Sequence, residues 1–153
     1  MKKQKKFTEL QTTICGNFGE DLILKEFGNK HNLKIYIQQK DNSSYPVDAI
    51  ALYNGKAYGI EVKTKPRFKF FDKTGMDTPD HTTYMEMNID VYVLFVDYIE
   101  KKIYGNWIKK LDKHKKIEGN ITTYPLSEMK VYRNLTDKEV DDLKELSRSN
   151  YYR

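Results

Sequence analysis

The sequence predicts a mixed α/β domain in which a central mixed β-sheet is flanked by helices. Three observations support this prediction. The pair Asn54-Gly55 joins two short apolar runs, and Asn-Gly between such runs is the strongest local signal of a β-hairpin. The later run Ile89–Val96 is almost continuously apolar, as in a strand that is buried on both faces. Amphipathic helical patterns precede and follow these strands, so helices are expected to cover the sheet.

Length and composition suit one globular domain with a charged surface. The chain has 153 residues, which is enough for a single domain with its own hydrophobic core. Its 27 Lys and Arg against 22 Asp and Glu give a net charge of +5, and 12 Tyr and 7 Phe accompany the lysines. Positive charge neutralises phosphates and aromatic rings stack on bases, so this composition suits a nucleic-acid partner. A Lys-rich surface that only aids solubility is the alternative, and composition leaves both open.

The single cysteine, Cys15, excludes an internal disulfide and a zinc site built from several cysteines. No apolar run is long enough to cross a membrane, and no apolar signal segment follows the basic residues Met1–Lys6. We therefore expect a cytoplasmic protein, with residues 1–12 forming a flexible basic arm.

The first expected element is a helix over Thr13–Asn29. Glu20 shares a stripe of this helix with Ile23, Leu24 and Phe27, at spacings i+3, i+4 and i+7. Two interpretations of Glu20 stay open. Either it lies at the edge of the apolar stripe and reaches water, or it faces inward and needs a cation or a metal as partner.

A strand is expected at Leu33–Gln39, and the hairpin follows with strands Val47–Tyr53 and Lys56–Lys63. A two-residue turn fixes the register of the two hairpin strands. In that register Asp48 lies directly opposite Glu61, and directly opposed side chains point to the same face of the sheet.

The expected hairpin presents two carboxylates and an ammonium on one face, because side chains alternate along a strand and Lys63 shares the face of Glu61. Opposed carboxylates repel each other and destabilise a strand pair. The apolar residues around them are typical of a buried strand, and a divalent cation such as Mg²⁺ is the usual compensation for clustered acids. The alternative is an edge hairpin whose Asp48 and Glu61 face water and whose Lys63 forms a surface ion pair.

A long connection, Pro66–Thr83, is expected after the hairpin. Around its start Lys65, Arg67, Lys69 and Lys73 are interleaved with three phenylalanines. A basic, aromatic loop next to the acids is well placed to hold a DNA backbone. The alternative is a solvated loop whose phenylalanines pack into the core.

The sequence Thr78-Pro79-Asp80 is interpreted as a turn within this connection. His81 is interpreted as an ordinary loop histidine, with proton transfer or phosphate contact as the alternative. The three histidines lack metal-ligand spacing, and no Gly-rich phosphate-binding loop is present, which disfavours an enzyme that consumes nucleotide triphosphate.

The rest of the chain predicts further alternation of helices and strands. The last helix opens on the capping pattern Thr136-Asp-Lys-Glu139. The expected elements are a short helix at His81–Met87, strands at Ile89–Val96 and Lys102–Trp107, a short basic helix or loop at Ile108–Lys116, a last strand at Ile121–Tyr124 and a helix at Leu135–Ser149.

Asp48, followed after twelve residues by Glu61-Val62-Lys63 on two strands of a hairpin, resembles the PD-(D/E)xK nuclease superfamily. Glu20 occupies the place where many members keep an additional metal-site glutamate. Over residues 13–107 the order of elements is most similar to the archaeal-type Holliday-junction resolvases. The sequence departs from the motif at Pro46, which Val47 separates from Asp48.

The resemblance implies a restriction-endonuclease-like core with a Mg²⁺ site, in which Mn²⁺ substitutes. Asp48, Glu61 and the backbone carbonyl of Val62 would ligate the metal, and Glu20 would complete or bridge a second position. Lys63 would orient or help deprotonate the attacking water. The products would carry a 5′-phosphate and a 3′-hydroxyl.

The expected activity is therefore Mg²⁺-dependent cleavage of DNA, with branched DNA as the first substrate. A restriction-like or single-strand-directed nuclease of the same fold is one alternative, and a non-catalytic DNA-binding module is another. A resolvase would be a two-fold homodimer, because a four-way junction has two symmetric strands to cut. Ile89–Val96 and the C-terminal helix are the two candidate interfaces.

Overall fold

A six-stranded mixed sheet forms the centre of the computed structural model, which describes residues 23–31, 33–37 and 46–148. Its strand order is β1-β2-β3-β5-β6-β9, and a second sheet has the order β4-β8-β7. The pair β3–β5 is parallel and the other neighbours in both sheets are antiparallel. The elements are β1 (Lys34–Ile37), β2 (Ala49–Tyr53), β3 (Lys56–Thr64), β4 (Lys73–Asp77), α2 (Thr78–Glu86), β5 (Asp90–Asp97), β6 (Lys102–Trp107), α3 (Ile108–Asp112), β7 (Lys116–Glu118), β8 (Ile121–Pro125), the 3-10 helix η2 (Leu126–Glu128), β9 (Lys130–Asn134) and α4 (Asp137–Arg148).

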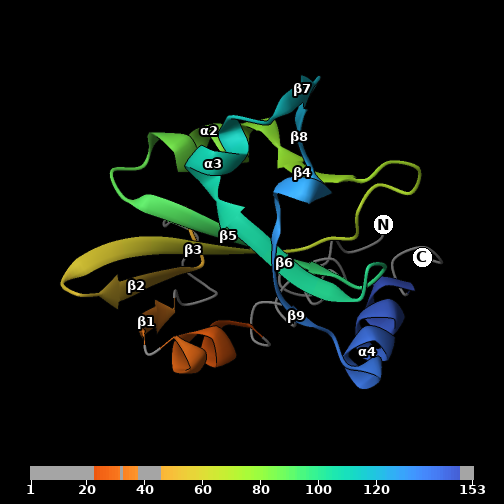
Figure 1. Cartoon of the computed structure of the whole chain (residues 1–153), viewed down its shortest axis with the longest axis horizontal. Helices are drawn as coiled ribbons and strands as arrows, with labels where there is room; N and C mark the ends of the chain where they lie inside the picture. Colours follow the sequence, from red (N-terminus) through yellow and green to blue (C-terminus); the bar gives the residue numbers. More distant parts are fainter. Residues whose placement is uncertain (1–22, 32, 38–45, 149–153) are drawn as a thin grey trace, which may run out of the picture.

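Helices cover both faces of the six-stranded sheet, which confirms the predicted fold class (Figure 1). One apolar cluster packs the helical residues 23–30 and α4 against one face, through side chains such as Leu24 and Leu143. The other cluster packs α2, α3 and the small sheet against the opposite face, through Tyr84, Leu111 and Tyr124. Strand β5 contributes to both clusters, as expected for a strand buried on both sides.

The hairpin forms in the predicted register. Tyr53 pairs with Lys56, and the ladder runs back to the pair Ala49–Ile60. Both turn residues have positive φ, at 50° for Asn54 and 74° for Gly55, which a type I′ turn requires.

The start of α4 also confirms the capping pattern predicted from Thr136 and Glu139. The Glu139 backbone N–H donates to Thr136 Oγ1 at 3.2 Å, and the Thr136 N–H donates to Glu139 Oε1 at 2.9 Å. This reciprocal pair is the capping box that the sequence predicts.

The prediction that Pro66–Thr83 is one long connection is wrong, because this segment contains β4 and the start of α2. β4 is stabilised by pairing with β8, whose residues follow it by more than 40 positions, so no local pattern reveals it. Thr78-Pro79-Asp80 is the first turn of α2 and not an isolated turn, since Pro fits where the backbone N–H has no helical acceptor.

Other expectations need smaller corrections. The helix expected at His81–Met87 begins at Thr78, and Ile121–Tyr124 is not the last strand, because β9 follows it. The end of the expected segment Ile108–Lys116 belongs to β7. Of the helix Thr13–Asn29, only residues from 23 onward lie in the described part, and residues 1–12 lie outside it.

Within the described residues, no helix is long and apolar enough to cross a membrane.

Candidate active site

The hairpin brings Asp48 and Glu61 together where its ladder stops. Ala49–Ile60 is the last backbone pair, and Asp48 lies in a bend just before β2. Two residues further along β3, the Val62 backbone N–H donates to Asp48 Oδ2 at 2.8 Å in place of a partner carbonyl. The side chain of Asp48 thus replaces the ladder and is fixed next to β3.

Both carboxyl groups are removed from water. Glu61 is 7% exposed, and burial raises its pKa to about 9, helped by the neighbouring Asp48 and opposed by Lys63. Burial also raises the pKa of Asp48, against the hydrogen bond from Val62. A hydrogen bond joins the two carboxyl groups, so near neutral pH this pair shares a proton.

The backbone of Val62 adds an oxygen to this pair. In an extended strand the N–H and C=O of one residue point to the same edge. Since the Val62 N–H points to Asp48, its carbonyl oxygen points to the same edge of β3. Two carboxylates and one carbonyl therefore converge where β2 begins.

This donor set fits a hard divalent cation, because Mg²⁺ is usually held by one or two carboxylates and completes its shell with waters and substrate phosphate oxygens. A cation would also replace the shared proton of the buried pair. Within the described ranges, no three His, Cys, Asp or Glu side chains gather into a ligand set. Glu20, the expected additional ligand, lies outside the described residues.

Lys63 lies on the same face, as predicted, but has a second acidic partner. Its Nζ is 4.0 Å from Glu61 Oε1 and 2.9 Å from Asp80 Oδ2. It also lies 5.6 Å from the centre of the Tyr84 ring. These contacts hold the ammonium next to the carboxylates while 23% of the side chain stays exposed.

Asp80 and Tyr84 of α2 are site residues that the sequence reasoning missed. Tyr84 is buried, and its hydroxyl forms a hydrogen bond with Glu61. The two residues are four positions apart and therefore lie on one helix face. Pro79 at the start of α2 was the available signal, because proline favours the first turn of a helix.

His81 is not a loop residue. It is 4% exposed on α2, with Nδ1 2.5 Å from the Tyr124 hydroxyl and Nε2 2.8 Å from Asp112 Oδ1. These bonds tie α2 to β8 and α3, and the preceding residue Asp80 bonds to Lys63 of β3.

The four basic residues expected to hold DNA differ in their surroundings. Arg67 is engaged inside the protein, by ion pairs with Asp72 and Glu100. Lys73 Nζ lies 2.9 Å from an exposed carboxylate, whereas Lys69 is exposed. The fourth, Lys65, has a pKa lowered chiefly by burial. Contact of these residues with DNA remains a prediction.

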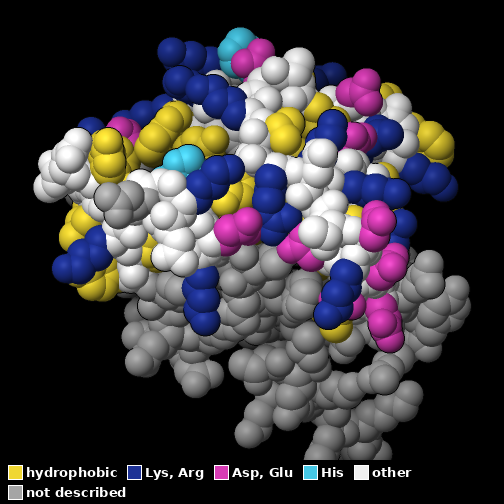
Figure 2. Space-filling view, turned by 60° about the horizontal axis from the view of Figure 1, so that its bottom comes forward, with side chains coloured by type: hydrophobic (Ala, Val, Ile, Leu, Met, Phe, Trp, Pro, Cys, Tyr) yellow, Lys and Arg dark blue, Asp and Glu magenta, His cyan; other side chains and the backbone are white. Residues whose placement is uncertain are grey.

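Lys and Arg side chains are spread over the described part of the face in Figure 2, with hydrophobic side chains between them. A hollow of about 590 Å³ is lined by rings that include Tyr58, Tyr92 and Trp107 and does not include the acid pair. The acid pair is thus not part of that cavity.

Comparison with known proteins supports the fold. No protein-family model and no curated protein matches the sequence. Among solved structures, the chain is similar to Hjc, a Holliday junction resolvase from the archaeal hyperthermophile Archaeoglobus fulgidus, with a TM-score of 0.51 and 14% identity over 74% of this chain and 85% of that one. It is also similar to D212, a nuclease from a fusselovirus, with a TM-score of 0.52 and 11% identity over 97% of this chain and 99% of that one. These likenesses show a PD-(D/E)xK-like, restriction-endonuclease-like fold.

Proposed function

We propose that this chain, whose fold is that of the PD-(D/E)xK nucleases, is a Mg²⁺-dependent endodeoxyribonuclease in a single catalytic domain. The observation that carries the proposal is the buried pair of Asp48 and Glu61 with Lys63 beside it. The two similar structures are a resolvase and a nuclease, which supports DNA as the substrate. A cytoplasmic location is part of the proposal.

Asp48, Glu61 and the Val62 carbonyl would hold Mg²⁺ or Mn²⁺, and Glu20 would extend the site. The cation would supply positive charge at the cleaved phosphate and lower the pKa of a water. Asp48 keeps its place through the Val62 N–H, and Tyr84 fixes the Glu61 carboxyl.

Lys63 would orient the attacking water and stabilise the charge that develops on the phosphate. Its ion pair with Asp80 makes Asp80 a positioning residue for this lysine. The reaction breaks the bond between phosphorus and the 3′ oxygen, so the products carry a 5′-phosphate and a 3′-hydroxyl. Lys65, Arg67, Lys69 and Lys73 would contact the DNA backbone.

Branched DNA is the first proposed substrate. Symmetric cleavage of a four-way junction would need a homodimer, for which α4 is the proposed interface. The other expected interface, Ile89–Val96, is wrong, because β5 is a central strand that pairs with β3 and β6 and is buried on both faces. A restriction-like or single-strand-directed nuclease is the second candidate, because the acid pair itself carries no preference for DNA shape.

The test is cleavage of a labelled four-way junction, a matched duplex and a single strand in Mg²⁺, Mn²⁺ or EDTA. Asp48→Asn should remove cleavage of every substrate. Asp90→Asn is the matched control, since Asp90 is a surface acid paired with Lys109 and should keep activity. Cleavage that survives in EDTA or in Asp48→Asn would overturn the proposal. Binding without cleavage would leave a DNA-binding module.

A further inference from the structure

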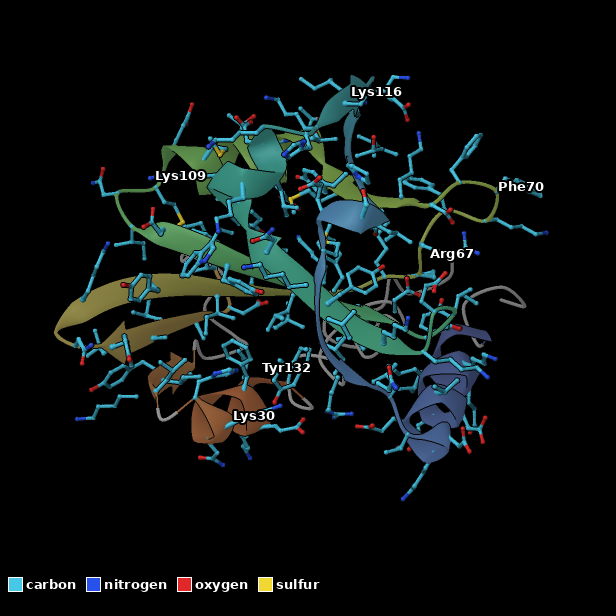
Figure 3. All side chains as sticks on the ribbon, in the orientation of Figure 1. Lys30, Arg67, Phe70, Lys109, Lys116 and Tyr132 are labelled. Carbon is cyan, nitrogen blue, oxygen red and sulfur yellow. The ribbon has the colours of Figure 1, made fainter. Side chains whose placement is uncertain are left out.

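The segment 65–72, which we call the wedge loop, starts two residues after Lys63 and joins β3 to β4. Phe70 and Phe71 at its tip are 81% and 61% exposed, the highest values among the large hydrophobic residues of the described chain. In Figure 3, Phe70 lies at the outer edge of the loop and Arg67 nearer to the sheet. Full burial of one such side chain is worth about 1.5–3 kcal/mol, so two adjacent exposed rings favour a partner.

The backbone of the wedge loop is held from inside. Arg67 Nη1 lies 3.4 Å from the carbonyl oxygens of Phe68 and Phe71, and its own backbone N–H donates to buried Asp97 at 2.9 Å. The Phe68 N–H donates to the Lys73 carbonyl at 3.0 Å. The rings are therefore displayed by a fixed loop, which lowers the entropy cost of binding.

Positive charge accompanies the exposed rings. Lys69 Nζ is 5.4 Å from the centre of the Phe70 ring, and Lys73 Nζ is 5.0 Å from that of Phe71. A hollow of about 300 Å³ beside Phe71 is also lined by Lys73, His114 and Lys116, and by Asp72, which pairs with Arg67. Aromatic rings next to a basic groove are the two parts from which sites for unpaired DNA are built.

An acid pairs with part of this charge. Glu118 lies 2.9 Å from Lys73 Nζ and 3.6 Å from Lys116 Nζ. Exposed pairs of this kind contribute little to stability, so a DNA phosphate can take the place of Glu118 at low cost. The lysines also argue against a protein partner, because Lys is depleted at protein–protein interfaces.

The geometry points to a role for this loop that rests on the proposed nuclease function. We propose that Phe70 and Phe71 stack on unpaired bases, so that the preferred substrate is DNA whose base stack is interrupted close to the cleaved bond. Phe70 is seven residues from Lys63, which bounds their Cα separation to about 25 Å at full extension. That length corresponds to about seven nucleotide steps of 3.4 Å.

The test measures binding in EDTA, so that the DNA stays intact. One labelled duplex is continuous, and a matched duplex carries three unpaired nucleotides at its centre, one of them 2-aminopurine. The full chain is compared with the double variant Phe70→Ala/Phe71→Ala and with Phe70→Trp. Val131→Ala is the control, because Val131 is a 57% exposed apolar residue on β9.

We expect the double variant to lose about 10- to 100-fold in affinity for the bulged duplex, as for one or two stacked bases, and less than about threefold for the continuous one. The 2-aminopurine signal should respond to the wild-type chain and to Phe70→Trp but not to the double variant. Val131→Ala should match the wild type on both substrates. Thermal unfolding of each variant should agree with the wild type within about 2 °C, since the rings are exposed.

An equal loss of affinity for both duplexes would overturn the proposed stacking of Phe70 and Phe71 on unpaired bases, and it would leave only general binding to the DNA backbone. The proposal would also be overturned if the double variant kept its affinity for both duplexes, or if the wild-type chain did not prefer the bulged duplex. Because the readout is affinity, its result is separate from cleavage. A chain that binds bulged DNA through the rings but cuts nothing would contradict the nuclease proposal alone.

Discussion

The guanidinium of Arg133 and the ammonium of Lys63 each lie beside carboxylates and each lower the pKa of those carboxylates, but only beside Lys63 does burial outweigh that effect. Arg133 donates two hydrogen bonds to Glu139, at 2.8 and 2.9 Å, and two to Glu26 on the helical segment 23–30. These bonds lower the pKa of Glu139 to about 2. Lys63 instead leaves Asp48 and Glu61 with raised pKa values.

The difference separates a structural group from a group that we propose to be functional. In the Arg133 cluster, formed with Glu26 and Glu139, one guanidinium donates hydrogen bonds to both carboxylates and joins the helical segment 23–30 and α4 to β9. The acid pair, Asp48 and Glu61, has more negative charge than its neighbours compensate, so its stable ionised form calls for a cation from outside. Buried acids therefore point to function when their charge is left incomplete.

The largest expected effect is on the rate of DNA cleavage, which should depend on the acid pair and not on the Arg133 cluster. Glu61→Gln should reduce the rate of DNA cleavage by about 10³-fold or more, because a carboxylate that would hold the cation is lost. Arg133→Lys should leave the rate per folded molecule unchanged. Single-turnover cleavage at saturating enzyme measures both. A similar loss in both variants would remove the distinction.

Stability should show the reverse order. Arg133→Met should lower the free energy of unfolding by about 2 kcal/mol, allowing for partial exposure, because two carboxylates lose their charged donor. For a chain of this size that corresponds to a decrease in Tm of about 4–8 °C. Circular dichroism melts test this, with Glu26→Gln as a milder companion because Glu26 is more exposed than Glu139. An unchanged melt would show that the cluster is not structural.

Binding of the cation gives the next effect. Mg²⁺ at ten times its Kd should stabilise the folded chain by about 1.4 kcal/mol. This stabilisation should be absent in Asp48→Asn and intact in Arg133→Lys. A thermal shift that persists in Asp48→Asn would place the cation elsewhere.

Low pH and high pH should change the stability of the folded chain through different carboxyl groups. Glu139 has a lowered pKa, so its contribution to stability is complete above about pH 4.5 and is lost as the pH falls toward 2. Glu61 has a raised pKa, so the folded chain binds more protons than the unfolded chain between about pH 4.5 and 9, and stability falls as the pH rises through that range. In EDTA, Glu61→Gln should flatten the alkaline slope and Glu139→Gln the acid slope. Denaturant midpoints across pH test this, and unchanged slopes would contradict the assigned shifts.

Local sequence signals are sufficient to predict the parts of the fold and of the candidate site that residues close in the sequence form. Asn54-Gly55 fixes the hairpin and thereby the meeting of Asp48 with Glu61, and Thr136 with Glu139 fixes the start of α4. The order of elements through β6 follows from apolar periodicity, apart from β4 and the start of α2.

Non-local contacts could not be predicted in this way. β4 has no apolar run and depends on β8 for its pairing, and the Asp80–Lys63 bond joins residues 17 positions apart in different elements. Arg67 is predicted to contact DNA, and no local pattern reveals its acidic partner Glu100, which comes from a turn more than 30 residues later. Sequence patterns reveal that a side chain is charged but not which distant group neutralises it.

The replacement of one ladder bond by the Asp48 carboxylate also bears on how such a chain diverges. Asp48 to Lys63 span sixteen residues, so one hairpin supplies both acids, the Val62 carbonyl and the lysine. Selection for the site then constrains few positions, provided that the two strands keep their register, since a slip by one residue would turn every side chain to the other face. The remaining surface is free to drift, which is consistent with a shared fold at only 11–14% identity. Insertions would be tolerated in loops outside this hairpin and excluded within its strands.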